Sequence, residues 1–187
     1  MQKFIIKGKG EYMNEIEEVY KNVAKGLLNN FFYNKKVFAK QEKDENNRIV
    51  FMTKYQGIDV VKIKYALKNK NAFMSYQQDQ NNLKWICLDF DIQKNVQGKD
   101  YDFFLDETYR PKLLEDISIT TKKLDELIIK YIIEYSGNRG IHIWILFDSE
   151  TSKAVGFTIL EKIIKSIEFK YAFKDGSGIV IDKYPKN

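Results

Sequence analysis

The sequence has few or none of several features that specific functions require. Cys87 is its single cysteine, which excludes an intrachain disulfide and a cysteine-rich zinc site. No apolar stretch approaches the roughly 20 residues that a membrane-spanning helix needs. The first residues carry too many charges, and too short an apolar segment, for a secretory signal peptide. We therefore expect a cytoplasmic protein with no membrane partner.

Histidine and arginine are also scarce. His142 is the only histidine, and Arg139 is one of three arginines, whereas lysine is abundant. Both lie in the segment SGNRGIHIW at 136–144, next to Gly137 and Gly140. The single histidine and one of the three arginines thus lie together in one glycine-flanked turn.

The residues that are plentiful favour a folded domain. Of the 187 residues, 44% are hydrophobic and 14% aromatic, which excludes low-hydrophobicity disorder and suits one globular domain. Cys87 lies in an apolar run and is expected in the core. The net charge of +5 suits an anionic partner such as a nucleic acid or a nucleotide. A lysine-coated surface without such a partner explains the charge equally well.

Residue patterns predict two helices and three strands in the first 80 residues. Apolar residues recur at helical spacing over 12–31, after Asn14 as an N-cap, and a shorter helix is expected at 58–68. Alternating or β-branched runs predict the strands at 35–40, 47–55 and 71–77.

The remaining residues predict a central sheet. The run 83–92 is almost continuously apolar, as in a strand buried on both faces. Pro111 starts a helical segment that changes to a strand before Ser136, and the glycines at 137–140 form a tight turn into a strand at 141–147. A helix at 150–171, capped by Ser149 or Ser152, and a strand at 179–182 follow. The expected fold is α+β with a mostly antiparallel sheet.

Three aspartates lie in or at the end of predicted strands. Asp89 and Asp91 are two residues apart, so both point to one face while Phe90 points to the other. Paired carboxylates repel unless a cation lies between them, and their hard oxygens suit Mg²⁺ or Mn²⁺. Two exposed carboxylates at a sheet edge remain an equal alternative. Taken alone, Asp182 would be interpreted as a surface residue at the end of a strand. Together with Asp89 and Asp91, it supplies the third acidic strand end that a site with two metal ions would require.

The turn at 136–144 combines several groups that bind phosphate. Gly137 and Gly140 allow backbone N–H groups to form an anion-binding concavity, and Ser136 adds a hydroxyl. Arg139 can grip a phosphate with two donors, and His142 can donate from the following strand. The alternatives are an ordinary hairpin and a satisfied, half-buried histidine.

The flanking residues of this strand are expected to alternate between the two faces of the sheet. Ile141 and Ile143 should face the core, whereas Trp144 shares the face of His142 and can hold its ring in place. A triphosphate-binding turn that faces paired carboxylates is the arrangement that nucleotidyl transfer needs.

These segments resemble a known family. LDFDI at 88–92, SGNRGIHIW at 136–144 and the strand that ends at Asp182 are similar to motifs I, II and III of the archaeo-eukaryotic primase superfamily. The layout around them, including DKYPKN at 182–187, is closer to the primase-polymerases of bacterial mobile and defence systems. CRISPR-associated primase-polymerases belong to this group, and the sequence does not separate the chain from them.

The resemblance implies a single primase-polymerase catalytic core over 1–187. It consists of a small N-terminal α/β module at 1–80 and an RRM-like, mostly antiparallel palm sheet flanked by helices at 81–187. The implied activity is template-directed nucleotidyl transfer from nucleoside triphosphates on single-stranded or primed DNA, with two Mg²⁺ or Mn²⁺ ions. The implied metal ligands are Asp89, Asp91 and Asp182, and the implied nucleotide-binding residues are Ser136, Gly137, Arg139 and His142.

Family members carry basic residues beyond motif III, whereas this sequence stops five residues after Asp182. We therefore expect it to be part of a longer protein, with other domains or defence-system proteins as partners. A non-catalytic module that binds single-stranded nucleic acid on the same fold is the main alternative. A sugar-nucleotide transferase could use Asp89 and Asp91 but would leave the serine, arginine and histidine of the turn without a role.

Overall fold

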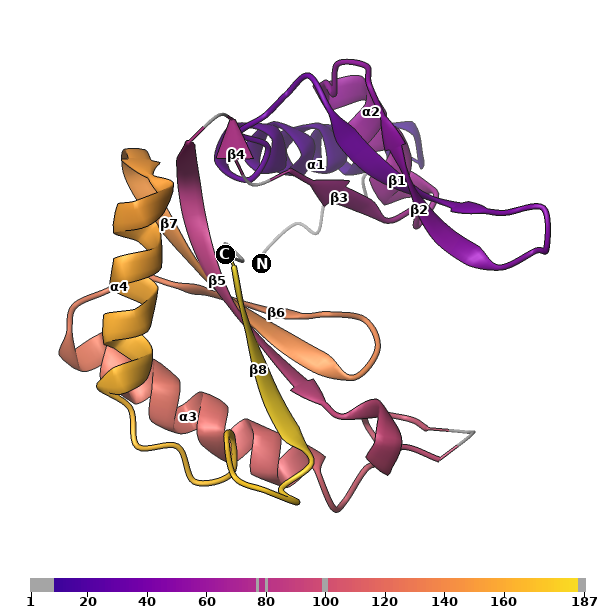
Figure 1. The fold of residues 1–187 in the computed structure, drawn as a ribbon. Coiled ribbons are helices and arrows are strands. Elements are labelled where there is room, and N and C mark those ends of the chain that lie inside the picture. Colours follow the sequence, from indigo (N-terminus) through magenta and orange to yellow (C-terminus); the bar gives the residue numbers. More distant parts are fainter. Residues whose placement is uncertain (1–8, 77, 80, 99–100, 185–187) are drawn as a thin grey trace, which may run out of the picture. The chain divides into compact units, whose positions relative to one another are not determined.

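The computed structural model describes residues 9–76, 78–79, 81–98 and 101–184 (Figure 1). The chain divides into two compact units, Met1–Gln80 and Asn81–Asn187. Each unit has its own hydrophobic core, and each is described by itself. Among the described residues, no helix is both long enough and apolar enough to cross a bilayer.

The first unit packs two helices on a small antiparallel sheet of order β2-β1-β3. Ala24, Phe32, Phe38 and Ile63 form the centre of its core. Its elements are α1 (Lys9–Asn30), β1 (Phe38–Lys43), β2 (Ile49–Lys54), α2 (Val60–Lys68), β3 (Phe73–Ser75) and β4 (Gln78–Asp79).

Polar contacts at the ends and sides of the helices complete this unit. Asp59 caps α2 by accepting a hydrogen bond from the backbone N–H of Lys62 at 2.8 Å. Glu17 on α1 forms ion pairs with Lys64 and Lys68 on α2, which tie the two helices together. The prediction of Asn14 as an N-cap was wrong, because α1 already begins at Lys9. The residues before Asn14 lack the apolar periodicity that marked the helix, yet helical hydrogen bonding continues through them.

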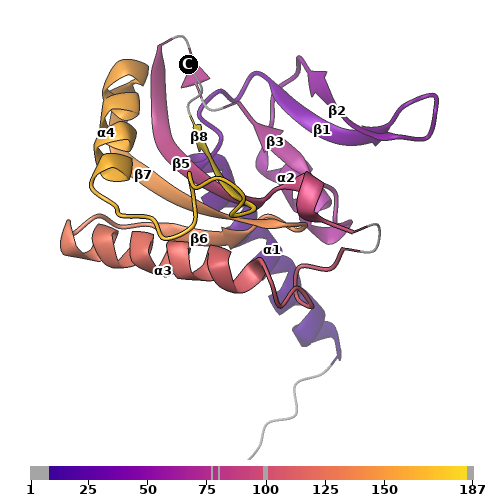
Figure 2. The same cartoon turned by 60° about the horizontal axis from the view of Figure 1, so that its bottom comes forward.

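The second unit contributes four strands to a five-stranded sheet: β7 and β8 each pair antiparallel with β5, and β6 pairs antiparallel with β7. The short strand β4 also pairs with β5. Two helices, α3 and α4, pack on the same face of that sheet (Figure 2). The elements of this unit are β5 (Asn82–Ile92), the 3₁₀ turn η1 (Lys94–Val96), α3 (Arg110–Glu126), β6 (Ile132–Tyr135), β7 (Gly140–Ser152), α4 (Lys153–Lys165) and β8 (Ile179–Tyr184).

Alternation along the strands separates the core face of the sheet from its other face. Leu88 and Phe90 on β5 and Ile143 on β7 are fully buried against residues of the two helices, such as Leu113 and Leu160. The residues between them in sequence point away from the helices. The fold class predicted from the sequence is confirmed: the protein is α+β, with antiparallel sheets and helices packed on them.

The helix predicted at 150–171 is shorter than expected at both ends. β7 continues through Ser152, and Ser152 rather than Ser149 caps α4 by accepting a hydrogen bond from the N–H of Val155 at 3.3 Å. After α4, the buried carboxylate of Asp116 on α3 accepts hydrogen bonds from the backbone of Lys170 and Ala172 at 2.7 and 2.6 Å. These contacts satisfy N–H groups that a continued helix would have used.

Candidate active site

Strand register brings the predicted site residues together on the sheet face opposite the helices. Asp89 on β5 is the partner of His142 on β7 and, on its other side, of Asp182 on β8. Asp91 pairs in the same way with Gly140 and Val180. Segments far apart in the sequence therefore meet on three adjacent strands.

The two carboxylates of β5 share one face, as the alternation predicted. Their side chains are 15% (Asp89) and 19% (Asp91) exposed, whereas Phe90 between them is fully buried. Asp182 lies on β8 and is exposed. Both aspartates of β5 are thus largely removed from water, which is costly for a charged group without a partner.

His142 is held between two carboxylates. Its Nε2 lies 3.3 Å from Oδ1 of Asp89, and its Nδ1 lies 2.9 Å from Oε2 of Glu134. The same oxygen of Glu134 accepts a hydrogen bond from Trp144 Nε1 at 2.8 Å. The Trp144 ring meets the His142 ring edge to face, with centroids 5.3 Å apart. The ring of His142 is therefore fixed from several sides, including by Trp144 as predicted.

The surrounding charges decide the protonation of His142. Burial lowers its pKa, but Asp89 and Glu134 outweigh that effect and raise the pKa to about 9. The pKa of Glu134 is lowered, mainly by its hydrogen bond with His142. Without a bound metal ion, the histidine is therefore a cation at neutral pH.

Arg139 forms an ion pair with Asp91, the second carboxylate of β5. Its Nη2 lies 2.6 Å from Oδ2 of Asp91, and its Nη1 donates to the carbonyl oxygen of Ile92 at 3.2 Å. The pKa of Asp91 is nevertheless raised, first by burial and then by the nearby charge of Asp89, against the opposing effect of Arg139. The predicted triphosphate contact of Arg139 thus lies directly beside a predicted metal ligand.

The turn between β6 and β7 is a hairpin, as predicted, but its hydrogen bonds differ from the predicted anion-binding concavity. The N–H of Gly140 donates inward to Oγ of Ser136 at 3.2 Å, and the N–H of Ser136 donates to the carbonyl of Gly140 at 3.0 Å. Gly140 therefore does not present its N–H to a ligand. Gly137 adopts a φ of +90°, which favours glycine.

Gly140 has a second role that the sequence did not reveal. A Cβ at this position would collide with the carboxylate of Asp91 and the carbonyl of Phe90. The absent side chain lets β7 pass closely beside Asp91. This glycine thus makes room for a predicted metal ligand.

The fit of a divalent cation can be judged from the acidic residues themselves. Within the part of the chain that the structure describes, no group of three or more acidic, histidine or cysteine side chains is arranged to hold a metal ion. However, Oδ1 of Asp89 is buried and accepts no hydrogen bond, and it forms only the 3.3 Å ion pair with Nε2 of His142. A buried carboxylate oxygen left in this way is costly, and a cation would satisfy it. Asp89 and Asp91 therefore fit one divalent cation, and Asp182 lies in register to join them.

Glu134 is the residue that sequence reasoning missed. It lies on β6 directly across from His142, four residues before the centre of the turn at Asn138, while His142 lies four residues after it. Counting outward from the turn would have paired the two residues. Cys87, by contrast, is buried as predicted.

Residues 13–175 match the family model described as "TOTE conflict system, Archaeo-Eukaryotic Primase domain". The chain belongs to the archaeo-eukaryotic primase family. The match includes Asp89, Asp91 and the turn at 136–144 and ends before Asp182. The resemblance of the motifs to this family is thereby confirmed, while the link to CRISPR systems stays a prediction. No curated protein sequence matches the chain.

The fold of this primase-family chain is also similar to a solved structure, described as the polymerase domain from Mycobacterium tuberculosis ligase D in complex with DNA. The TM-score is 0.56 at 12% sequence identity, over 90% of this chain and 70% of the other. At this identity the likeness concerns the fold alone.

Proposed function

We propose that the chain is the catalytic core of a template-directed nucleotidyltransferase, a DNA primase-polymerase. Membership of the primase family supports this class of activity. The observation that carries the proposal is the register of three strands, which sets Asp89 between His142 and Asp182 on one face. Carboxylates next to a cationic histidine suit a substrate whose phosphates bind to metal ions and to fixed donors.

In this proposal Asp89, Asp91 and Asp182 hold two Mg²⁺ or Mn²⁺ ions. When bound, such ions neutralise phosphate charge and activate an attacking hydroxyl. The buried Oδ1 of Asp89, which accepts no hydrogen bond, and the hard oxygen donors of all three residues support this assignment. Asp182 would complete the ligand set from β8.

The cationic side chains of the turn bind the triphosphate. His142, held by Glu134 and Trp144, directs its Nε2 side toward Asp89 and donates to a phosphate oxygen. Arg139 is partly exposed and is paired with Asp91. We expect its guanidinium to exchange Asp91 for a phosphate when a cation binds that carboxylate, because guanidinium binds phosphate in the same forked geometry. Ser136 and Gly137 contribute from the same turn.

The proposed partners are a single-stranded or primed DNA template and deoxy- or ribonucleoside triphosphates. The solved polymerase domain with a similar fold is in complex with DNA. The net charge of +5 is in keeping with a polyanionic partner.

Primer extension with Mn²⁺ tests the proposal. We expect the wild type to extend a primed template and Asp89→Asn to lose extension, with far-ultraviolet circular dichroism unchanged. The matched control is Asp148→Asn, because Asp148 is an exposed aspartate further along β7. Extension at the wild-type rate by Asp89→Asn would disprove the proposed role of this carboxylate.

A non-catalytic module that binds single-stranded nucleic acid is the second candidate. It is favoured by one observation: among the described residues, the acidic side chains do not form a complete cluster of three around one point. Tight binding of single-stranded DNA by the wild type, without extension under any divalent cation, would support this candidate over the first.

A further inference from the structure

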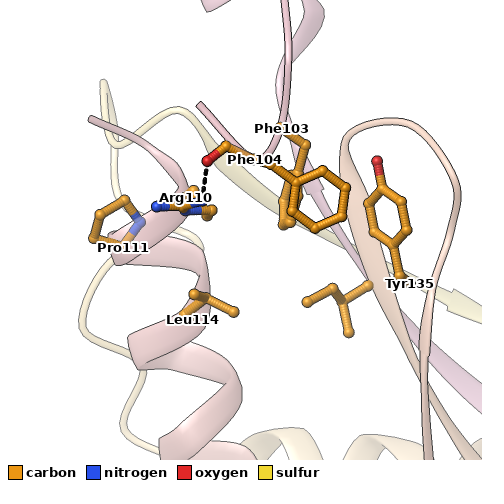
Figure 3. Close-up of a pocket in the computed structure, with 7 residues that line it drawn as sticks. Phe103, Phe104, Arg110, Pro111, Leu114 and Tyr135 are labelled. Atoms are coloured by element: carbon orange, nitrogen blue, oxygen red, sulfur yellow. Dashed lines mark hydrogen bonds between the residues drawn. The ribbon is translucent and has the colours of Figure 1, made fainter. Parts of the chain in front are cut away.

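An aromatic pocket lies in the second unit, apart from the carboxylates and His142. It has a volume of about 390 Å³ and is lined by Phe103, Phe104, Arg110, Pro111, Leu114 and Tyr135, with Ile141 completing the wall (Figure 3). The start of α3 forms one side, and the aromatic rings form the other. Tyr135 alternates with Glu134 along β6, so the pocket opens on the opposite face of the hairpin from His142.

Three rings are packed against one another at this pocket. The Tyr135 ring centroid lies 5.1 Å from that of Phe103 and 5.0 Å from that of Phe104. Phe103 is buried and supports the other two rings, whereas Phe104 is 61% exposed and Tyr135 is 39% exposed. Exposed aromatic rings that are grouped and held in place indicate a ligand surface rather than core packing.

The loop that carries these rings is fixed before any ligand binds. Asp102 accepts a hydrogen bond from the N–H of Phe104, and Asp106 accepts one from the N–H of Tyr109, each at 2.8 Å. Arg110 donates to the carbonyl oxygen of Phe104. These contacts hold the loop at both ends, so a ligand would meet a preformed pocket.

Arg110 gives the pocket its charge. The chain has three arginines, and one of them lies at the proposed catalytic turn while another lies here. A guanidinium stacks on planar rings and also binds phosphate, which lysine does less well. A pocket with apolar rings and one arginine therefore favours a planar ligand that carries negative charge nearby.

We propose that this pocket binds an unpaired base of single-stranded nucleic acid. Aromatic side chains accept any base by stacking, and Arg110 can contact the base plane or the adjacent phosphate. A purely apolar peptide would not use the positive charge of Arg110, whereas a phosphate beside the base would. The hydroxyl of Tyr135 donates a hydrogen bond to the carbonyl oxygen of Asn138 at 3.1 Å, so the pocket borders the turn, on the opposite face of the hairpin from His142. The inference rests on the proposed function only in that the chain binds nucleic acid.

Binding without metal tests the inference separately from catalysis. Fluorescence anisotropy in EDTA would compare a labelled thymidine oligomer of about 20 nucleotides, longer than one binding site, with an abasic oligomer of the same length. The two ligands have the same phosphate charge and differ only in their bases. We expect the wild type to prefer the oligomer with bases. We expect Phe104→Ala to weaken that binding about fivefold to a hundredfold while leaving abasic binding unchanged.

Leu105→Ala is the matched control, because Leu105 is 77% exposed next to Phe104 but does not line the pocket. It should bind both oligomers as the wild type does. Arg110→Lys should give an intermediate loss, since it retains the charge but not the planar group. Cross-linking of an oligomer that contains 5-iodouracil should label the segment 101–110 or Tyr135.

Three results would overturn the inference. One is a base preference that persists in Phe104→Ala, and another is cross-linking confined to other segments. The third is a change of oligomeric state in Phe104→Ala with unchanged DNA binding, which would assign the pocket to a protein contact. Any of these could occur while Asp89 remains essential for extension, so the inference and the proposed function can fail independently.

Discussion

Asp89 and Asp182 lie directly opposite each other on neighbouring antiparallel strands, β5 and β8. Like charges in this position destabilise a sheet, and Asp89 is also largely buried. A pairing that costs stability is expected where the carboxylates serve a ligand rather than the fold.

Asp182→Asn should separate stability from activity. Without metal, removing one of the facing charges should raise the free energy of unfolding by about 0.2–1 kcal/mol. With Mn²⁺, the same variant should lose primer extension and gain less stability from the cation than the wild type does. Urea unfolding with EDTA and with Mn²⁺ measures both effects. Equal stabilisation of both proteins by Mn²⁺ would remove Asp182 from the ligand set.

Glu134→Gln should change the titration of His142. The chain has one histidine, so the imidazole signals in the proton NMR spectrum of untagged protein belong to His142 alone. In EDTA the wild-type pKa should lie near 9, and the variant should titrate closer to the ordinary value of 6.5, because one of the two carboxylates is lost. An unchanged titration would contradict the role assigned to Glu134.

The same variant should have weaker nucleotide binding. A hydrogen bond to a charged group is worth roughly 1.5–3 kcal/mol, so kcat/KM should fall about tenfold to a hundredfold, mainly through KM. His142→Ala should give a loss of the same size by removing the contact itself, with metal binding at Asp89 and Asp91 retained. Loss of metal binding in His142→Ala, with nucleotide affinity intact, would make the histidine a ligand instead.

Gly140→Ala should disturb the site through Asp91. The added methyl group has no space beside the Asp91 carboxylate and the Phe90 carbonyl, so the unfolding free energy should fall by about 1–3 kcal/mol and extension should decrease. Gly26→Ala is the control, because Gly26 lies inside α1 with open space around its Cα. That variant should be unchanged or more stable, since alanine favours helix. A fully active Gly140→Ala protein would contradict the close approach.

The first unit should respond to pH through Glu17. Its pKa is lowered, chiefly by the hydrogen bond with Lys68, so its contribution to stability is present above the unfolded value of 4.5. That contribution is lost as the pH falls through the lower, folded value. The difference in melting temperature between the wild type and Glu17→Gln should therefore exist at pH 7 and diminish toward pH 3. High salt should reduce it as well, because the pair is on the surface.

Much of the fold could be predicted because its signals are local. The apolar run around Phe90, the helix that starts near Pro111 and the glycine turn after Ser136 each follow from residues close in sequence. Asp89 and Asp91 could be placed on one face from strand alternation alone. To predict that the segment 88–92 lies beside the segment 136–144, it was enough to assume that their two strands pair.

The contacts that escaped prediction depend on tertiary register. Glu134 contacts His142 because of the hairpin pairing. Asp116 lies on α3, and its carboxylate accepts a hydrogen bond from the backbone N–H of Ala172, in the segment that follows α4. The pairing of Arg139 with Asp91 depends on how closely β5 and β7 approach, and the inward N–H of Gly140 depends on the geometry of the turn between β6 and β7. No local pattern encodes these distances.

The order of the strands also has a consequence for the protein during its synthesis. β5 is made before β7 and β8, and of these three paired strands β8 comes last. Until β8 is made, the stretch Cys87–Ile92 of β5 has the backbone hydrogen-bonding groups of one edge unpaired, and such edges promote aggregation. A nascent chain would thus carry this hazard while β5 awaits its last neighbour.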